Sequence, residues 1–126
     1  MRELTRAEEQ VMQILWIIKK GFVKDILEHI DEPKPAYNTV STIVRILQDK
    51  GFVSHKAYGR THEYFPLISK SDYSKAHLNN FVKNYFSNSF EKMVSFFARE
   101  KGISVAEMGE IMRIMEQEIK KQNSEI

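Results

Sequence analysis

Apolar residues recur at helical spacing in three successive segments of the first half of the chain. The first segment predicts a helix over residues 5–19, opened by the capping-box sequence Thr5-Arg6-Ala7-Glu8 and lined on one face by Val11, Ile14, Leu15 and Ile18. The second predicts a short helix over residues 23–30, which Pro33 and Pro35 separate from the third. The third predicts a helix over residues 36–50, whose buried face consists of Val40, Ile43, Val44 and Leu47.

The opposite face of the third predicted helix carries short polar side chains, where a solvated helix usually carries Glu, Lys or Gln. This face consists of Asn38, Thr39, Ser41, Thr42 and Arg45. Such side chains approach base edges and phosphates closely, so the face is typical of a surface that enters the DNA major groove. A plainer interpretation is that Asn38, Thr39 and Ser41 only cap the helix. Capping leaves Thr42 and Arg45 unexplained.

After Gly51 the pattern changes from helical spacing to alternation. Residues 52–57 and 62–66 alternate in the manner of strands, and the turn sequence Tyr58-Gly59-Arg60-Thr61 between them predicts a β-hairpin. Three helices followed by a hairpin is the order of a winged helix-turn-helix domain, whose third helix enters the major groove. Arg60 at the tip and Lys56 on the first strand are then placed to neutralise phosphates, although Lys56 alone fits an ordinary solvated lysine equally well.

The second half of the chain predicts three further helices, beginning near Ser69, Phe90 and Ser104. Five of the eight phenylalanines lie within residues 81–97, and short helices struggle to bury so many large side chains internally. We therefore expect a second copy of the chain to cover them, the alternative being that the helices pack on the first domain. The candidate dimerisation residues are Phe81, Tyr85, Phe86, Phe90, Phe97, Met108, Ile111, Met112 and Met115.

These elements predict a mainly α fold with a small β-hairpin wing. A winged helix-turn-helix domain is expected at residues 1–68, and a three-helix dimerisation region at residues 69–126. Composition adds that the chain contains no cysteine, which excludes disulfides, thiolate metal sites and thiol nucleophiles. The net charge of +2 says little, but residues 33–62 carry five basic side chains against one acidic one. No apolar run approaches the roughly 18 residues of a membrane span, and no signal-peptide pattern opens the chain, so we expect a cytoplasmic protein without membrane association.

Four stretches of the sequence stand out together: LTRAEEQVMQILW at residues 4–16, YNTVSTIVRIL at 37–47, KGFV at 50–53 and GRTHEY at 59–64. In this order and spacing they resemble the penicillinase and methicillin-resistance repressor family (BlaI/MecI), which includes the copper-responsive CopY-type repressors. The resemblance covers the first 66 residues well and residues 81–115 more loosely. It implies a homodimeric repressor that binds a palindromic operator in double-stranded DNA, with Arg60 on the wing and the polar face of the third helix on the DNA.

The resemblance also raises two modes of regulation. In family members of the β-lactam type, a protease activated through a membrane sensor cuts an Asn-Phe bond in the dimerisation region. Phe96-Phe97 corresponds to that bond here, so the pair is a candidate cleavage site that lacks the expected asparagine. CopY-type members sense metal through a C-terminal cysteine cluster, and a chain without cysteine cannot sense copper in that way.

Other function classes find less support in the sequence. The four histidines show no metal-ligand spacing, and a Gly-rich phosphate loop is missing, so we expect no enzyme, no cofactor and no metal site. His55 and His62 could meet across the hairpin, but isolated strand histidines are more often structural. The remaining alternative is a winged helix that only binds proteins. It would place large apolar side chains on the outer face of the third helix, where the sequence has polar ones.

Overall fold

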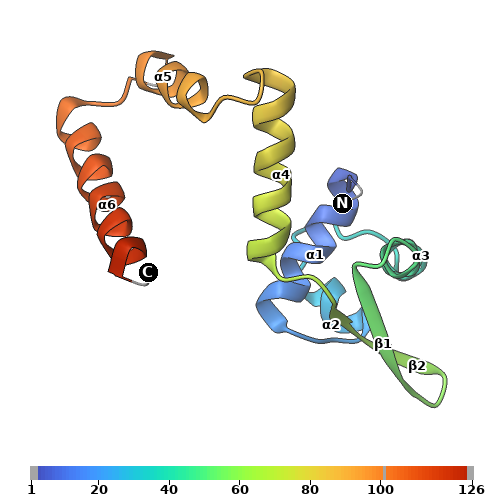
Figure 1. Cartoon of the computed structure of the whole chain (residues 1–126). Helices are drawn as coiled ribbons and strands as arrows, with labels where there is room; N and C mark the ends of the chain where they lie inside the picture. Colours follow the sequence, from blue (N-terminus) through green and yellow to red (C-terminus); the bar gives the residue numbers. More distant parts are fainter. Residues whose placement is uncertain (1–2, 101, 125–126) are drawn as a thin grey trace. The chain divides into compact units, whose positions relative to one another are not determined.

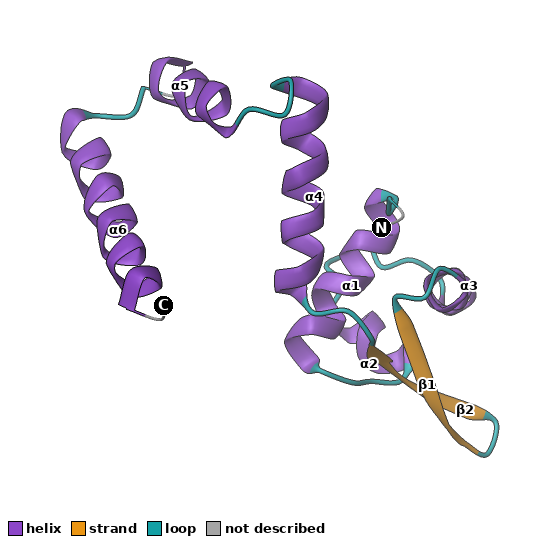
Figure 2. Ribbon diagram, viewed as in Figure 1, coloured by secondary structure: helices purple, strands orange, loops and turns teal. Residues whose placement is uncertain are grey.

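The computed structural model describes residues 3–100 and 102–124 of the 126-residue chain. Three helices come first: α1 (Arg6–Ile18), α2 (Val23–Glu28) and α3 (Tyr37–Asp49). The strands β1 (Val53–Tyr58) and β2 (Thr61–Pro66) follow, and then the helices α4 (Lys70–Tyr85), α5 (Phe90–Glu100) and α6 (Val105–Ser124) (Figures 1 and 2). The predicted fold class, mainly α with a hairpin wing after the third helix, is confirmed.

Local sequence signals explain where α1 begins and which face it buries. The Thr5 hydroxyl accepts a hydrogen bond from the Glu8 backbone N–H at 3.2 Å, and the Glu8 carboxylate accepts one from the Thr5 N–H at 2.8 Å. This reciprocal pair is the predicted capping box, which satisfies two backbone donors that helix formation leaves without a partner. The buried apolar side chains that follow are Val11, Met12, Ile14 and Leu15.

The helix α3 begins without a side-chain cap. Its N-cap residue is Ala36, which has no side-chain oxygen to accept from the first turn. The interpretation of Asn38, Thr39 and Ser41 as caps is therefore wrong, because all three lie inside the helix. The apolar face of α3 is buried as predicted. It consists of Val40, Val44 and Leu47, with Ile43 partly buried against the same core.

The hairpin is a two-stranded antiparallel sheet in which Val53 pairs with Pro66 and Tyr58 with Thr61. Gly59 opens the two-residue connection with φ +63°, a conformation that side chains with a Cβ rarely adopt. The turn between α1 and α2 is tied to this sheet. The Gly21 N–H donates to the Tyr64 carbonyl at 2.9 Å, and the Tyr64 N–H donates back to Gly21 at 2.8 Å. The start of α2 is therefore held beside the hairpin.

The chain divides into two compact units, Met1–His77 and Leu78–Ile126. The first unit includes the first turns of α4 because Tyr73 is buried in its core. The Tyr73 ring centroid lies 5.6 Å from that of Trp16 and 5.9 Å from that of Phe52. The Trp16 indole also donates to the Ile68 carbonyl at 2.8 Å, which fixes the approach to α4. The division of function at residues 68 and 69 stays a prediction.

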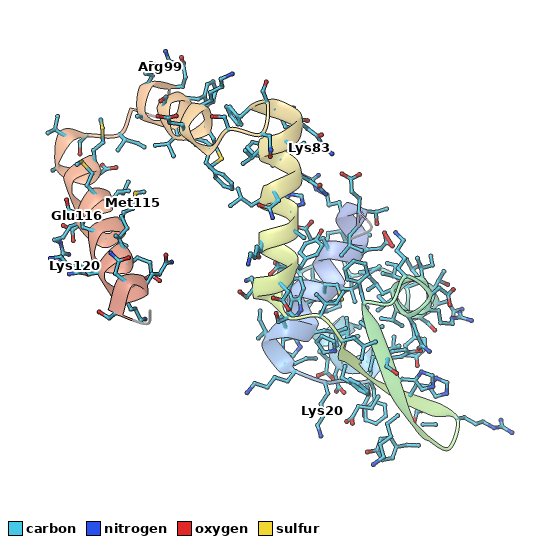
Figure 3. All side chains as sticks on the ribbon, viewed as in Figure 1. Lys20, Lys83, Arg99, Met115, Glu116 and Lys120 are labelled. Atoms are coloured by element: carbon cyan, nitrogen blue, oxygen red, sulfur yellow. The ribbon has the colours of Figure 1, made fainter. Side chains whose placement is uncertain are left out.

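The second unit leaves much apolar surface uncovered. None of the described residues of α5 and α6 is buried, although Val82 in α4 is. Phe86 packs against Phe81 and Phe96, with ring centroids 5.6 and 5.5 Å away. Met115 stands out from α6 and is 54% exposed (Figure 3). Within the described ranges, no helix has the length and apolar character needed to cross a membrane.

Candidate nucleic-acid interface

The polar residues predicted on the outer face of α3 are accessible in the structure. Asn38, Thr39, Thr42 and Arg45 are exposed, and Ser41 is partly exposed. The Thr42 hydroxyl donates to the Asn38 carbonyl at 2.9 Å, and the Arg45 Nε donates to the Ser41 carbonyl at 3.3 Å. These bonds hold both side chains along the helix while the Thr42 methyl and the Arg45 terminal nitrogens remain available. The face can therefore donate and accept hydrogen bonds at short range.

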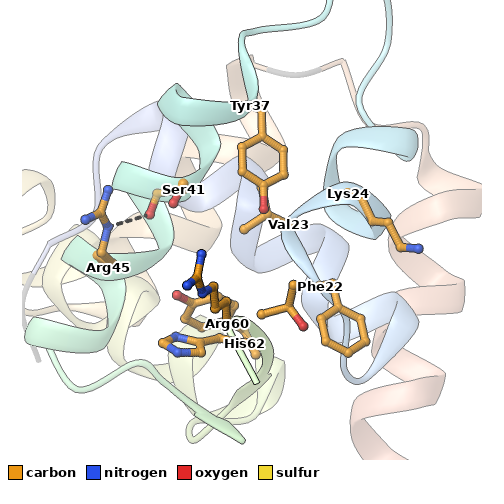
Figure 4. Close-up of a pocket in the computed structure, with 10 residues that line it drawn as sticks. Phe22, Val23, Lys24, Tyr37, Ser41, Arg45, Arg60 and His62 are labelled. Carbon is orange, nitrogen blue, oxygen red and sulfur yellow. Dashed lines mark hydrogen bonds between the residues drawn. The ribbon is translucent and has the colours of Figure 1, made fainter. Parts of the chain in front are cut away.

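A groove with a volume of about 450 Å³ lies between the first turns of α3, the start of α2 and the hairpin (Figure 4). Its cationic residues are Lys24, Arg45 and Arg60, and among the described residues no carboxylate side chain lines it. The remaining lining residues are Phe22, Val23, Tyr37, Ser41, Thr61, His62 and Tyr64. Burial raises the pKa of Tyr64, with a smaller opposing effect of the Arg45 charge, so Tyr64 is a neutral part of the wall. The groove therefore suits an anion.

Sequence reasoning missed Lys24 and Tyr37 as members of this site. Neither residue belongs to the polar face of the third helix or to the hairpin tip. Lys24 lies at the rim of the groove because the Gly21–Tyr64 hydrogen bonds bring the start of α2 to the hairpin. No signal in the local sequence could have placed it there.

Two lysines of the basic segment have structural roles instead. The Lys50 ammonium lies 2.8 Å from each carboxylate oxygen of Glu8, whose side chain is only 4% exposed. The Lys34 ammonium donates to the carbonyls of Leu27 and Ile30 at 2.9 and 2.6 Å, and so caps the end of α2. The basic side chains of residues 33–62 that have no such structural role are therefore Arg45, Lys56 and Arg60.

The two predicted wing residues differ in their surroundings. Arg60 is exposed in the hairpin turn and lines the groove. Lys56 is exposed outside the groove, opposite Glu63 in the strand register, and its ammonium lies 5.3 Å from the Tyr58 ring centroid. An acidic neighbour and an aromatic ring both favour the interpretation of Lys56 as a solvated lysine.

The histidines of the hairpin form a stacked pair. The rings of His55 and His62 lie 4.0 Å apart at an angle of 6°, and the Nδ1 atom of His55 lies 2.8 Å from the side-chain oxygen of Gln48. In the part of the chain that the structure describes, no group of three His, Asp or Glu side chains could hold a metal ion. The pair builds the aromatic inner surface of the hairpin beside the groove.

The residues predicted to form the dimer lie in the second unit with differing exposure. Phe81, Phe86, Phe97 and Met108 are partly buried. The others are exposed, from 48% to 74%: Phe90, Ile111, Met115, Met112 and Tyr85. The candidate cleavage pair Phe96-Phe97 lies inside α5 rather than in a loop. A protease that binds extended substrates would need α5 to unwind locally before cutting it.

Comparison with known proteins shows what the chain is similar to. The family model described as "Penicillinase repressor" matches residues 4–117. The methicillin resistance regulatory protein MecI of Staphylococcus aureus is 28% identical over 114 residues, covering 90% of this chain and 93% of that protein. The penicillinase repressor of Bacillus licheniformis is 24% identical over 116 residues, covering 91% of each chain. The solution structure of the DNA binding domain of the repressor BlaI covers 56% of this chain and 88% of that one, with 26% identity and a TM-score of 0.49.

Proposed function

The chain belongs to the penicillinase repressor family, and from that premise we propose that it represses transcription by binding double-stranded operator DNA as a homodimer. One observation carries the proposal within this structure. The exposed polar face of α3 adjoins a groove that is lined, among the described residues, by three cationic side chains and no carboxylate. Sequence-specific DNA binding requires a surface that contacts base edges beside a surface that contacts phosphates.

The proposed contacts divide by chemistry. Asn38, Ser41 and Thr42 carry short hydrogen-bonding groups suited to base edges, and Arg45 can reach a guanine or a phosphate from the same face. Thr39 is exposed on the flank of α3, where it lines a hollow with Ala7 and Gln10 of α1, so we assign it to the DNA backbone. Arg60 on the wing contacts phosphate, and Lys56 contributes only long-range charge.

The homodimer follows from the uncovered apolar side chains of the second unit. Met108, Ile111, Met112, Met115 and Ile119 recur at helical spacing on α6, and the last four are 48% to 60% exposed. Water contact with such a stripe is unfavourable by about 25 cal/mol for each Å² of apolar surface, so a partner that covers it is strongly favoured. A symmetric dimer would present two copies of α3, which matches a palindromic operator.

Proteolysis in the same region would release repression. A cut at Phe96-Phe97 would separate α6, with its apolar stripe, from the DNA-binding unit. Loss of the dimer would then weaken operator binding, because two linked half-site contacts bind more tightly than one. We assign no catalytic activity to the chain itself, and we place it in the cytoplasm with its DNA.

Selection of bound sequences from random duplex DNA tests the proposed function directly. We expect the full-length protein to enrich a palindrome whose half-sites lie about one helical turn, or a multiple of it, apart. Enrichment of a single half-site would contradict the dimer. Failure to enrich any sequence, at salt concentrations where the protein is folded, would favour the alternative of a winged helix that binds only proteins.

A further inference from the structure

The groove between α3 and the hairpin lies where one strand of the DNA backbone has to pass. A winged-helix protein that inserts its third helix into the major groove and its hairpin tip into the adjacent minor groove straddles the backbone strand separating them. We propose that this groove holds that backbone strand, and that Lys24 is a phosphate contact at its rim. The proposal rests on the proposed function and adds a site that sequence reasoning did not assign.

The charge distribution of the groove supports a phosphodiester as its occupant. Each of its three cations comes from a different element: Lys24 from α2, Arg45 from α3 and Arg60 from the hairpin turn. Arg45 and Lys24 lie toward opposite sides of the groove with Arg60 between them, and the Lys24 side chain extends outward from the rim (Figure 4). A row of separated charges fits a linear polyanion better than one compact ion.

Among the described residues, the nearby carboxylates of Asp25 and Glu63 form no ion pair with these cations. The Asp25 carboxylate accepts a hydrogen bond from the Phe22 N–H at 2.9 Å and so caps the start of α2. Glu63 is paired with Lys56 in the strand register, and neither residue lines the groove. Lys24 is exposed and forms no ion pair with a carboxylate of the described residues, whereas Lys50 forms an ion pair with Glu8. Lys24 is therefore available to an external anion.

The groove is also organised before any DNA arrives. Val23 and Tyr64, which are 5% and 4% exposed, anchor its walls in the core of the first unit. The paired hydrogen bonds between Gly21 and Tyr64 hold the start of α2 against β2. The hydroxyl groups of Tyr37 and Ser41 add neutral donors beside the cations. Binding a phosphate here would cost little ordering of the backbone, which favours affinity.

A lysine in such a position contributes affinity without sequence preference. Its ammonium is a point charge, and a phosphate is the same in every nucleotide. The expected signature is equal weakening on all duplexes together with a shallower salt dependence, because one fewer counterion is released on binding. This signature separates Lys24 from a residue that reads bases.

The test compares full-length Lys24→Gln with full-length Lys75→Gln, which removes the same charge from an exposed position on α4 outside the groove. Binding is measured on a duplex chosen by selection and on an unrelated duplex over a series of salt concentrations. We expect Lys24→Gln to bind both duplexes roughly five- to tenfold more weakly. The slope of log K against log salt should fall by about 0.9, while the control keeps the wild-type values.

A second measurement locates the phosphate. Single backbone phosphates of the selected duplex are replaced, one at a time, by neutral methylphosphonate. At one position in each half-site, the replacement should weaken DNA binding by the wild-type protein and by the Lys75→Gln control. Binding by Lys24→Gln should not change at that position. The groove proposal is overturned if Lys24→Gln behaves like the control, or if no position shows this coupling, while the wild-type protein still prefers its selected duplex. A wild-type protein without any preferred duplex would instead refute the proposed function, whatever Lys24 does.

Discussion

Replacing Lys50 by methionine tests how strongly the buried ion pair with Glu8 joins the end of α3 to the start of α1. The Lys50 ammonium contacts both carboxylate oxygens of Glu8 at 2.8 Å, and the two side chains are 17% and 4% exposed. Lys50→Met leaves the Glu8 carboxylate buried, with the Thr5 N–H as its remaining donor. Breaking such a pair from one side costs about 3 to 5 kcal/mol.

Partial access of water to Lys50 places the expected loss at the lower end, about 3 kcal/mol of unfolding free energy. For a domain of this size that corresponds to a fall in Tm of about 12 to 24 °C. Circular dichroism during thermal and urea unfolding measures both quantities, with Lys20→Met as a control that removes an exposed lysine. The double variant Glu8→Gln/Lys50→Met should recover most of the loss, because it leaves no buried charge without a partner.

Acid sensitivity gives an independent readout of the same pair. Burial alone raises the pKa of Glu8, but hydrogen bonds from Lys50 and Thr5 and the Lys50 charge together lower it below its ordinary value of 4.5. A carboxyl whose pKa is lower in the folded state stabilises the fold above the unfolded pKa, and this stability is lost as pH falls through the folded pKa. The wild-type protein should therefore lose stability below about pH 4.5, and Lys50→Met should flatten that loss. The reasoning would be refuted if Lys50→Met kept the wild-type Tm and lost stability at acid pH to the same extent as the wild-type protein.

Three further predictions concern DNA binding and assembly. Thr42→Ala should reduce the discrimination between the selected duplex and its mutated forms by about 1 to 3 kcal/mol in titrations at fixed salt, and equal losses on all duplexes would reassign Thr42 to the backbone. Arg60→Ala should weaken binding without sequence preference and lower the salt slope by about one unit, so an unchanged slope would remove Arg60 from the phosphate contacts. Truncation after His77 keeps Tyr73 in the core and should yield a folded monomer with much weaker operator binding. Sedimentation of that fragment as a dimer would contradict the dimer assignment.

The helices and the hairpin could be predicted because their signals are local. The Thr5–Glu8 capping box, the helical spacing of Val40, Val44 and Leu47, and Gly59 in the turn each act within a few residues. The resemblance to the penicillinase repressor family rests on four such local stretches, and the family match confirms it. Order along the chain was enough to recognise the fold class.

The candidate site could be predicted only in part, because charge is redistributed by contacts between distant segments. Lys50 and Glu8 are 42 positions apart, and nothing near either residue indicates that they pair. Lys34 likewise donates hydrogen bonds to carbonyls at the end of α2, and the direction of those carbonyls cannot be predicted from the sequence. Counting basic residues therefore overstated the charge near α3, and it omitted Lys24, which only the folded chain brings to the groove.

These contacts also explain how α3 keeps its position without a side-chain cap. The N-terminus of α3 follows Ala36 and has no side-chain cap, so local sequence contributes little to holding that end. The buried residues Val40, Val44 and Leu47 hold the middle of the helix in the core, and Lys50 ties its far end to α1. The residues that we propose to face DNA are thus placed by the opposite face and the C-terminal end of their own helix. Lys50→Met changes no residue of the proposed interface. It should nevertheless weaken operator binding, because it removes the contact that attaches the end of α3 to α1.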